Sequence, residues 1–412
     1  MKKLVSDLHV EGKRVLVRVD FNVPHKGSVI SDDNRVRAAI PTIAELVNKN
    51  AKVILMSHLG KIKWGKVDDE EIENEKKKND LSIVIPALEE HLSAAVGHEV
   101  TVHFSEATRG EALAEAVASL NDGEVLLVQN TRYEKGETKN NPELAAEWAS
   151  LCDAYIMDAF GSAHRAHCST VGIPEVLNAD GRETAVGYLV EKEINGLGRC
   201  VDCPEEGRPY IAILGGSKVS DKIQVIDSLL GKCDKILIGG GMSYTFQAAL
   251  GHTVGNSLFE ADQVEYAKKC LESGKIVLPV DTLVSDAIEN HGPVSVVSGD
   301  IPEGQMGLDI GPATEALFSS EIANAKTIFW NGPMGVFESE EFANGTIAVC
   351  SACAGATDNG AFSVIGGGDS ASAAKQFGYA SRFSHVSTGG GASLELIQYD
   401  GHLPGIDVIQ DN

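Results

Sequence analysis

The chain has 412 residues, a length that suits two domains of roughly 200 residues each. Hydrophobic residues make up 43% and charged residues 23%, as in a packed globular protein. A formal net charge of -24 disfavours nucleic acid and anionic membranes as partners, because both would be repelled. The opening stretch MKKLVSDLHV lacks a signal-peptide pattern and no apolar run reaches the ~18 residues of a membrane span, so we expect a cytoplasmic protein.

Short apolar runs recur along the chain with helix-like patterns between them. The sequence predicts strands at 14–20, 51–56, 99–104, 124–128 and 154–157, and then at 210–214, 235–238, 275–280, 326–330 and 361–365. Continuous rather than alternating apolarity is typical of strands buried on both faces, and strand–helix repetition indicates parallel sheets. We therefore expect an α/β protein with two doubly wound, Rossmann-like domains.

Residues 184–203 separate the two groups of strands. The helix-like LVEKEINGL leads there into GRCVDCPEEGRP, which predicts a hinge helix and a division into domains 1–190 and 191–397. A second irregular segment, 63–80, is dense in charge, and we expect it to be a solvated insertion rather than a binding element.

Eight cysteines are scattered through the chain, and in a cytoplasmic protein most should be reduced and buried. Two pairs have CxxC spacing, Cys200/Cys203 and Cys350/Cys353. Four thiolates could hold zinc if the fold joined the pairs, although a zinc ribbon usually spaces its pairs by ~15 to 20 residues. The run 348–356 reads as a buried helix, so a structural role is favoured over a metal or redox role.

Polar and cationic residues follow the predicted strands of the first half. They are Arg18, Asp20, Asn22, Arg35, His58, Lys61, Asn130, Arg132, His164, Arg165 and His167. Ligands of open α/β sheets bind beyond the carboxyl ends of the strands, where these residues would converge. Because a guanidinium matches two oxygens of a phosphate or carboxylate, the pattern predicts a site for a small polyanion.

Glycine follows the strands of the second half instead. The loops contain Gly215, Gly216, Gly239–Gly241, Gly332, Gly335, Gly366–Gly368 and Gly389–Gly391. Glycine lets the backbone approach a phosphate or a flat base, and the following helix start favours anions. The chain has neither GxxxxGK[ST] nor an opening GxGxxG, so the predicted nucleotide site is assembled from several loops.

Three further residues in this half carry charge suited to a nucleotide. Lys218 and Lys222 would share one face if a helix starts near Ser217. Asp369 could hold Mg²⁺ beside phosphate oxygens, or cap the helix that follows it. A small-anion domain and a Mg-nucleotide domain across a hinge suit phosphoryl transfer with domain closure, which excludes water.

The chain resembles the phosphoglycerate kinase family over nearly its whole length. The stretches VRVDFNVP, SHLG, DAFGSAHRAHCST, GGSKVSDK, GGGMSYTF, WNGPMGVFE, GGGDSASAAK and STGGGASLELI occur in the family's order. The resemblance implies phosphoryl transfer between MgATP and the carboxylate of 3-phosphoglycerate, giving 1,3-bisphosphoglycerate and ADP, with ATP formed in glycolysis. It also implies that the tail 398–412 returns to the first domain and that the protein is a monomer.

The resemblance assigns roles to matching positions. Those for 3-phosphoglycerate are Asp20, Asn22, Arg35, His58, Lys61, Arg132 and Arg165. Those for the nucleotide are Gly216, Lys218, Lys222, Gly240, Asn331, Glu338, Gly368, Asp369 and Ser370, with Asp369 as the metal ligand. Arg35, Lys218, Gly390 and Gly391 would act on the phosphoryl group in transfer.

Some positions depart from the family pattern. Lys61-Ile62 stands where Arg-Pro is usual, QNTRY at 129–133 stands where ENVRF is common, and segment 63–80 is longer than common. Two other hypotheses stay open on the residues alone, a kinase for a different carboxylate and a catalytically silent nucleotide-binding protein.

Overall fold

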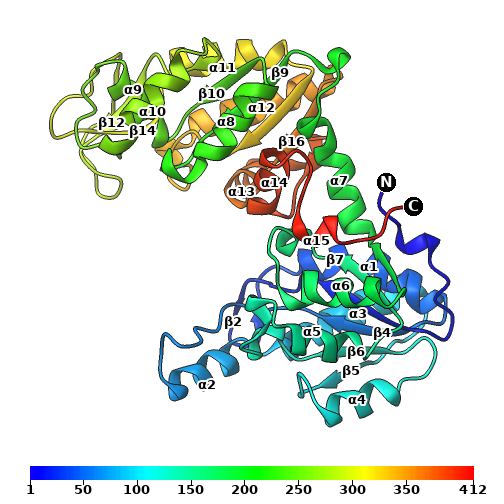
Figure 1. Cartoon of the computed structure of the whole chain (residues 1–412). Helices are drawn as coiled ribbons and strands as arrows, with labels where there is room; N and C mark the ends of the chain where they lie inside the picture. Colours follow the sequence, from blue (N-terminus) through cyan, green and yellow to red (C-terminus); the bar gives the residue numbers. More distant parts are fainter. The chain divides into compact units, whose positions relative to one another are not determined.

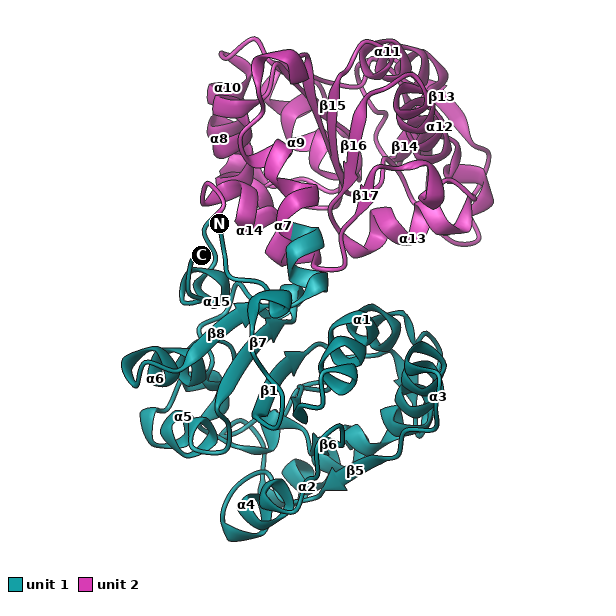
Figure 2. Ribbon diagram, turned by 90° about the vertical axis from the view of Figure 1, so that its right-hand side faces the viewer, with its two compact units in different colours: residues 1–193, 402–412 teal, residues 194–401 magenta.

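Two six-stranded parallel sheets, each flanked by helices, form the framework of the protein (Figure 1). The computed structural model describes all residues, 1–412. The chain divides into a first unit of residues 1–193 and 402–412 and a second of residues 194–401 (Figure 2). The boundaries after residues 193 and 401 lie a few residues beyond the expected ones, which were after residues 190 and 397. The two doubly wound α/β domains predicted from strand–helix repetition are confirmed.

The first unit contains the sheet β5-β6-β4-β1-β7-β8. Its strands are β1 (Arg14–Val19), β4 (Lys52–Met56), β5 (Val102–Ser105), β6 (Val125–Val128), β7 (Ala154–Asp158) and β8 (Glu183–Val186), and a hairpin joins β2 (His25–Lys26) to β3 (Val29–Ile30). Its helices are α1 (Asn34–Asn48), α2 (Asp69–Lys78), α3 (Ile85–Val96), α4 (Glu111–Ala118), α5 (Pro142–Ala149), α6 (Ile173–Ala179) and α15 (Pro404–Asp407). Short turns of helix occur at η1 (Val5–Asp7), η2 (Leu81–Val84), η3 (Thr131–Tyr133), η4 (Glu137–Lys139), η5 (Phe160–Ser162) and η6 (Cys168–Gly172).

The second unit contains the sheet β11-β10-β9-β15-β16-β17 and a smaller antiparallel sheet, β13-β12-β14. The strands are β9 (Tyr210–Leu214), β10 (Lys235–Ile238), β11 (Ile276–Val277), β12 (Thr282–Ser285), β13 (Ser295–Val297), β14 (Met306–Ile310), β15 (Thr327–Asn331), β16 (Phe362–Ile365) and β17 (His385–Val386). The helices are α8 (Ile223–Lys232), α9 (Met242–Ala249), α10 (Val264–Leu271), α11 (Pro312–Ala323), α12 (Asn344–Asp358), α13 (Gly368–Gln376) and α14 (Gly390–Gln398), with shorter turns η7 (Glu205–Gly207), η8 (Ser220–Lys222), η9 (Ala261–Gln263), η10 (Glu340–Phe342) and η11 (Ala380–Arg382). The boundary between the units falls within α7 (Tyr188–Val201).

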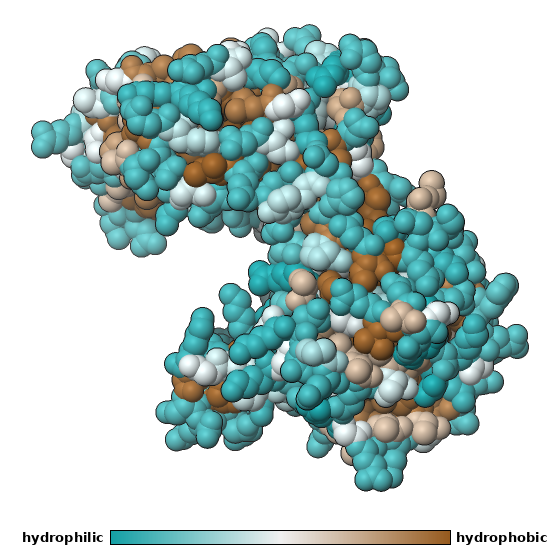
Figure 3. All heavy atoms as spheres, viewed as in Figure 1, coloured by the Kyte–Doolittle hydropathy of each residue, from teal (hydrophilic) through white to brown (hydrophobic).

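The central strands are buried on both faces, which is why their sequences are continuously apolar. Every residue of β6, β7, β9 and β15 is buried, and in β1 only Arg14 is partly exposed. Polar side chains lie elsewhere, and the face seen in Figure 3 is mostly hydrophilic with scattered apolar areas. No helix is both long and apolar enough to cross a bilayer.

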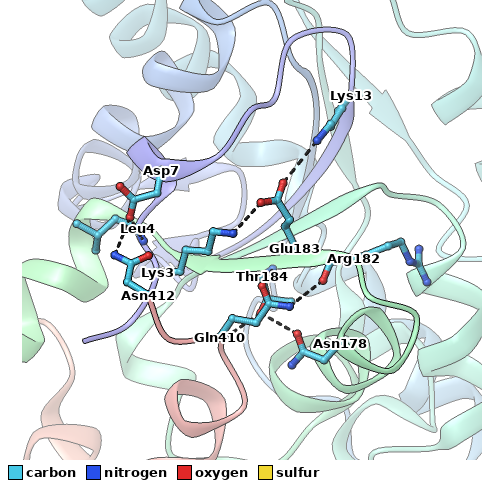
Figure 4. A network of polar contacts seen from close by, with 10 residues as sticks. All are labelled: Lys3, Leu4, Asp7, Lys13, Asn178, Arg182, Glu183, Thr184, Gln410 and Asn412. Carbon is cyan, nitrogen blue, oxygen red and sulfur yellow. Dashed lines mark hydrogen bonds and ion pairs between the residues drawn. The ribbon is translucent and has the colours of Figure 1, made fainter.

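Residues 402–412 of the C-terminal tail belong to the first unit and are held there by polar contacts, whereas residues 398–401 belong to the second unit (Figure 4). The backbone N–H of Gln410 donates to Thr184 Oγ1 at 3.1 Å, and its side-chain amide donates to the Arg182 carbonyl at 3.0 Å. Asn412 Nδ2 donates to Asp7 Oδ2 at 3.1 Å. Because Leu403, Ile406 and Ile409 are also buried, the tail completes the first unit's core.

The connecting helix expected within 184–203 is present, and three local details were not foreseen. Residues 184–186 form the edge strand β8, so the connecting helix α7 begins only at Tyr188 and then continues as far as Val201. Segment 63–80 contains a regular helix, α2, whose Glu75 and Ile72 are buried, so it is not simply a solvated insertion. The antiparallel sheet was not expected, because its short strands alternate with Gly- and Pro-containing turns.

The two CxxC pairs lie on helices or directly after one. Cys350 and Cys353 are buried within α12, the helix predicted there, and Cys200 is buried in α7 while Cys203 is partly exposed just after it. Burial raises the pKa of the Cys350 thiol to about 12, which disfavours the thiolate that metal binding needs. All eight cysteines are free, and no group of three or more His, Cys, Asp or Glu is placed to hold a metal.

Candidate functional site

The carboxyl ends of β1, β4, β6 and β7 carry the cationic residues of the first unit. Parallel pairing of these strands puts their ends at one edge of the sheet, as the sequence predicted. Ser57 Oγ accepts from the backbone N–H of Phe21 at 2.8 Å, and Asn22 Oδ1 accepts from Gly60 N–H at 2.8 Å. The loops after β1 and β4 are therefore joined to each other.

Asp20 and Arg35 form an ion pair at this edge. Burial acts to raise the pKa of Asp20, but the charges of Arg35 and Arg18 hold it below its ordinary value. Asp20 is therefore ionised, and its charge orients Arg35, whose side chain remains 35% exposed and accessible to a ligand.

Arg18 lies beneath the cluster and is only 1% exposed. Its Nε donates to Ser169 Oγ at 2.8 Å and its Nη2 lies 3.1 Å from His58 Nδ1. Ser169 in turn donates its backbone N–H to Glu137 Oε2 at 3.0 Å and its hydroxyl to Glu137 Oε1. A buried carboxyl thus stabilises the guanidinium through one serine.

Arg132 is a partly buried cation that lacks a full set of hydrogen-bond partners within the protein. Its guanidinium donates to the Gly60 carbonyl, and its Nε is buried with no hydrogen-bond partner. Burial, together with the charges of Arg18 and Arg165, lowers the pKa of Arg132 to about 10. Like charges repel, so a bound anion would reduce the repulsion among these arginines, which the protein's own groups leave uncompensated.

Three histidines line this edge and are held neutral. Burial lowers the pKa of His58 well below its ordinary value, and burial with the charge of Arg18 lowers that of His167 to about 4. Burial also lowers the pKa of His164, whose Nε2 accepts from Arg165 Nε at 3.0 Å. The positive charge of the site therefore comes from arginine.

The remaining predicted residues of the first unit have different surroundings. Lys61 and Arg165 have exposed side chains. Asn130 is fully buried: its Oδ1 accepts from Arg132 N–H at 3.1 Å and its Nδ2 donates to the Leu59 carbonyl at 2.7 Å. Asn130 therefore shapes the loops rather than facing a ligand.

Two adjoining cavities lie at the carboxyl edge of the second sheet. One, of about 230 Å³, is lined by residues that include Gly216, Lys218, Lys222, Asn331, Gly368, Asp369 and Ser370. The other, of about 340 Å³, is lined by residues that include Gly216, Gly240, Tyr244, Leu258, Leu308, Val336, Glu338 and Asp369. The first is rich in charge and backbone N–H groups and the second is more apolar, which matches the phosphate and base halves of a nucleotide.

Glycine is required where the loops after β9 and β15 meet. A Cβ on Gly215 would collide with the Pro333 carbonyl, and a Cβ on Gly332, whose φ is +103°, would collide with the Gly215 backbone. The close approach brings Lys222 to Asn331: its Nζ donates to Asn331 Oδ1 at 2.6 Å and to the Asn331 carbonyl at 3.1 Å. Burial lowers the pKa of Lys222 to about 8, against the opposing charge of Asp369.

Lys218 does not share a helix face with Lys222, contrary to the sequence prediction. The helix α8 begins only at Ile223, and Lys218 lies in an irregular stretch between the bend at 216–217 and the short turn η8. Lys218 is exposed, and both lysines nevertheless line the same cavity.

Asp369 is exposed in the first turn of α13, where the N-cap position is occupied by Gly367. It does not act as the cap that the sequence left open. Ser370 Oγ, by contrast, accepts from Gly332 N–H at 2.6 Å and fixes the neighbouring loop. Gly390 and Gly391 begin α14, so their N–H groups belong to the helical turn that lacks intrahelical acceptors.

Sequence reasoning missed two sets of site residues. Glu137 and Ser169 support Arg18 from beneath the anion edge, and neither lies directly after a strand. Met306 and Gly307 of β14, with Tyr244 and Ile288, add apolar wall to the larger cavity. No local pattern marks Glu137 or Ser169 as part of the site. The apolar wall residues lie near the glycine loops in sequence, but ordinary core packing explains apolar residues there equally well.

The comparisons with known proteins agree over the full length. A sequence model of the family described as phosphoglycerate kinase matches residues 5–400. Phosphoglycerate kinases of Listeria innocua and Clostridium novyi are 53% and 50% identical, with 100% of this chain and 99% of each relative covered. The structure of phosphoglycerate kinase from Coxiella burnetii has a TM-score of 0.84 at 35% identity, covering 99% of this chain and 98% of that one. The enzyme from Pyrococcus horikoshii OT3 has a TM-score of 0.80 at 30% identity, covering 100% and 98%.

Proposed function

The chain belongs to the phosphoglycerate kinase family, and we propose from this premise how its two carboxyl-edge sites carry the reaction. The activity is phosphoryl transfer between ATP and 3-phosphoglycerate in glycolysis. The observation that supports the proposed division of labour is the contrast between the sites. Arginine dominates the first unit's edge, whereas glycine loops, two lysines and an aspartate dominate the second unit's cavities.

The first unit binds 3-phosphoglycerate. Arg35, Arg132 and Arg165 neutralise its phosphate and carboxylate charges, and Lys61 adds a point charge. Asp20 holds Arg35 by the ion pair, His58 donates one neutral hydrogen bond, and Asn22 fixes the Gly60 loop. Arg18 supports the site from beneath.

The second unit binds the nucleotide. Leu258, Leu308 and Val336 face the base, Glu338 accepts from the ribose hydroxyls, and Gly240 permits close approach. Lys218 and Lys222 bind phosphate oxygens, aided by Gly216, Gly368 and Ser370 at the loops, while Asn331 holds Lys222 in place.

Asp369 is suited to Mg²⁺. Its carboxylate is exposed, lines both cavities and makes no cap bond, and one carboxylate with phosphate oxygens and water is a common Mg²⁺ environment. Mg²⁺ bound there supplies positive charge to the phosphate oxygens and lowers their repulsion.

The transfer needs no general base, because a carboxylic acid with an ordinary pKa near ~4 is ionised at neutral pH. A carboxylate oxygen forms a bond to the γ-phosphorus while the bond from phosphorus to the β-phosphate oxygen breaks, and ADP leaves with that electron pair. Lys218, Arg35 and the N–H groups of Gly390 and Gly391 balance charge on the phosphoryl oxygens. Closure of the two units about α7 excludes water and prevents hydrolysis.

The enzyme acts as a monomer in the cytoplasm.

Calorimetric titration of single-site variants tests the division of labour. Arg165→Ala should weaken 3-phosphoglycerate binding by roughly 10- to 100-fold, the range for a hydrogen bond to a charged group, and leave MgATP binding unchanged. Asp369→Asn should weaken MgATP binding and leave 3-phosphoglycerate binding unchanged. Loss of the same ligand in both variants would contradict the proposal, and sedimentation at several concentrations tests the monomer.

A further inference from the structure

Residues 61–80, which include the charged segment 63–80, are bonded to the loop that carries Arg132. Trp64 Nε1 donates to the Arg132 carbonyl at 2.9 Å, and the Tyr133 hydroxyl donates to the Lys76 carbonyl. Gln129 Nε2 donates to Asp80 Oδ1 at 3.0 Å, at the end of the segment. The segment, which includes the helix α2 at the periphery of the first unit in Figure 1, is thus connected to a candidate substrate-binding loop at three points, one of them on α2 itself.

Lys76 and two aromatic rings, those of Trp64 and Tyr133, form a cluster between the segment and the loop that carries Arg132. Lys76 Nζ lies 5.2 Å from the ring centroid of Trp64 and 5.8 Å from that of Tyr133, within the range of cation–π attraction. Glu75, nearly buried, accepts from Lys63 N–H at 2.6 Å and pairs with Lys63 Nζ at 2.9 Å. These contacts hold the stretch before α2 against the helix and so fix the position of Trp64.

Hydrogen bonds also hold the end of the segment in place, at Asn79. Asn79 is buried, and its Nδ2 donates to the Glu75 carbonyl at 2.8 Å. Asn130 Nδ2 donates to the Asn79 carbonyl at 2.9 Å and to the Leu59 carbonyl at 2.7 Å. The segment, the loop after His58 and the loop after β6 therefore form one hydrogen-bonded assembly.

Arg132 is at the centre of that assembly and needs such support. Its guanidinium donates to the Gly60 carbonyl at one end, and its own carbonyl accepts from Trp64 at the other. The charges of Arg18 and Arg165 repel it, and its Nε has no partner within the protein. Without restraint, a long side chain under such repulsion would turn toward solvent.

The departures from the family pattern meet here. Gln129 and Tyr133 differ from the common ENVRF residues, and both bond the segment that is longer than common. Lys61, at the segment's start, gives only a point charge where a guanidinium fork is usual. Binding of the substrate anion therefore depends more on the exact placement of the Arg132 guanidinium than it would if an arginine stood at position 61.

We infer that residues 61–80 form a positioning element for Arg132. Trp64 within the segment and Tyr133 on the loop that the segment contacts are the positioning residues for the 3-phosphoglycerate site. The inference rests on the proposed role of Arg132 in binding that anion. It replaces the expectation of a solvated insertion with a role in substrate affinity. Trp64 and Tyr133 touch no substrate and act through Arg132.

Steady-state kinetics of Trp64→Phe and Tyr133→Phe test the inference in the full-length enzyme. Trp64→Phe removes the indole N–H but keeps a ring for Lys76, and Tyr133→Phe removes only the hydroxyl. We expect KM for 3-phosphoglycerate to rise roughly 3- to 10-fold in each, the range that one neutral hydrogen bond supports. KM for MgATP and kcat should stay unchanged. Glu70→Gln, on an exposed position of α2, is the matched control and should leave every constant unchanged.

The substitution Lys61→Arg, which introduces the residue usual in the family, provides a second test. Introduced into Trp64→Phe, it should restore much of the lost affinity, because a second fork reduces the dependence on Arg132. Variants that melt at lower temperature yet keep the wild-type KM for 3-phosphoglycerate would overturn the inference, since the segment would then be structural only. Should Trp64→Phe fail to fold, Tyr133→Phe decides by the same criterion. Absence of 3-phosphoglycerate turnover in the wild type would contradict the assigned function instead.

Discussion

His58 Nδ1 lies 3.1 Å from Nη2 of the buried Arg18 guanidinium. A guanidinium only donates hydrogen bonds, so Nδ1 must accept and the ring proton must reside on Nε2. Burial holds the pKa of His58 well below its usual range, so this tautomer is neutral. His58 thus offers a substrate one uncharged donor.

The tautomer can be checked by nitrogen-15 NMR of the imidazole. We expect the His58 ring to keep a protonated Nε2 and a bare Nδ1 from about pH 5.5 to about pH 8, the interval in which an ordinary histidine titrates. His58→Gln identifies the signal by removing it. A His58 resonance that titrates within this interval would contradict the Arg18 contact as described.

Lys222 should make nucleotide binding sensitive to alkaline pH. Burial lowers the pKa of Lys222 to about 8, so the free enzyme loses this positive charge as pH rises through that value. KM for MgATP should therefore rise above about pH 8. Lys222→Arg keeps its charge at every accessible pH, so its KM should be flat there even if it is higher throughout. Parallel KM profiles of the two proteins would contradict the assignment.

Asp158 should make the first unit less stable as pH rises. Its Oδ1 accepts from Leu189 and Val190 N–H at 3.0 and 3.3 Å at the start of α7, and burial raises its pKa to about 7. The folded state therefore binds this proton more tightly than the unfolded state, so the stabilisation is present below about pH 4 and is lost as pH rises through about 7.

Asp158→Asn keeps an acceptor for α7 but cannot ionise. The free energy of unfolding of the variant, measured with urea at several pH values, should depend less on pH between about 4 and about 7 than that of the wild type. Equal slopes would show that Asp158 does not carry the buried proton. Asp309 in the second unit, whose pKa burial also raises to about 7, is unchanged in both proteins.

The returning tail should contribute strongly to stability. Ile406 is 3% exposed within α15, and removing its side chain beyond Cβ leaves a cavity that costs about 2–5 kcal/mol. Ile406→Ala should lower the melting temperature by several degrees, whereas His402→Ala, at an exposed position nearby, should change it little. Equal melting temperatures would contradict the role of the tail in the core.

The framework of the fold was predictable because buried parallel strands have a continuous apolar pattern. The runs at 210–214 and 235–238 coincide with β9 and β10. The strands β8 and β17 were not predicted, because edge strands are short and carry polar residues such as Glu183 and His385. Their pairing depends on the neighbouring strand, which no local pattern reveals.

The site was predictable where chemistry directly follows a strand. Asp20 and His58 lie at the ends of β1 and β4, and the charged cavity of the second unit collects Lys218, Lys222 and Asp369. What the sequence could not reveal is which polar groups bond one another. Glu137 reaches Arg18 only through Ser169, and Trp64 reaches Arg132 across 68 positions of chain. Such contacts are set by packing, not by spacing.

The central claim is tested most directly by a coupled assay of the purified protein with Mg²⁺, ATP and 3-phosphoglycerate, in which glyceraldehyde-3-phosphate dehydrogenase reports bisphosphoglycerate by consuming NADH. The rate should require all three ligands. It should fall by on the order of 10³ or more in Lys218→Ala, the scale of a cation that acts on the transferring phosphoryl group. A Lys218→Ala rate within a few-fold of wild type would remove Lys218 from catalysis, and no rate in the folded, ATP-binding wild type would contradict the assigned reaction.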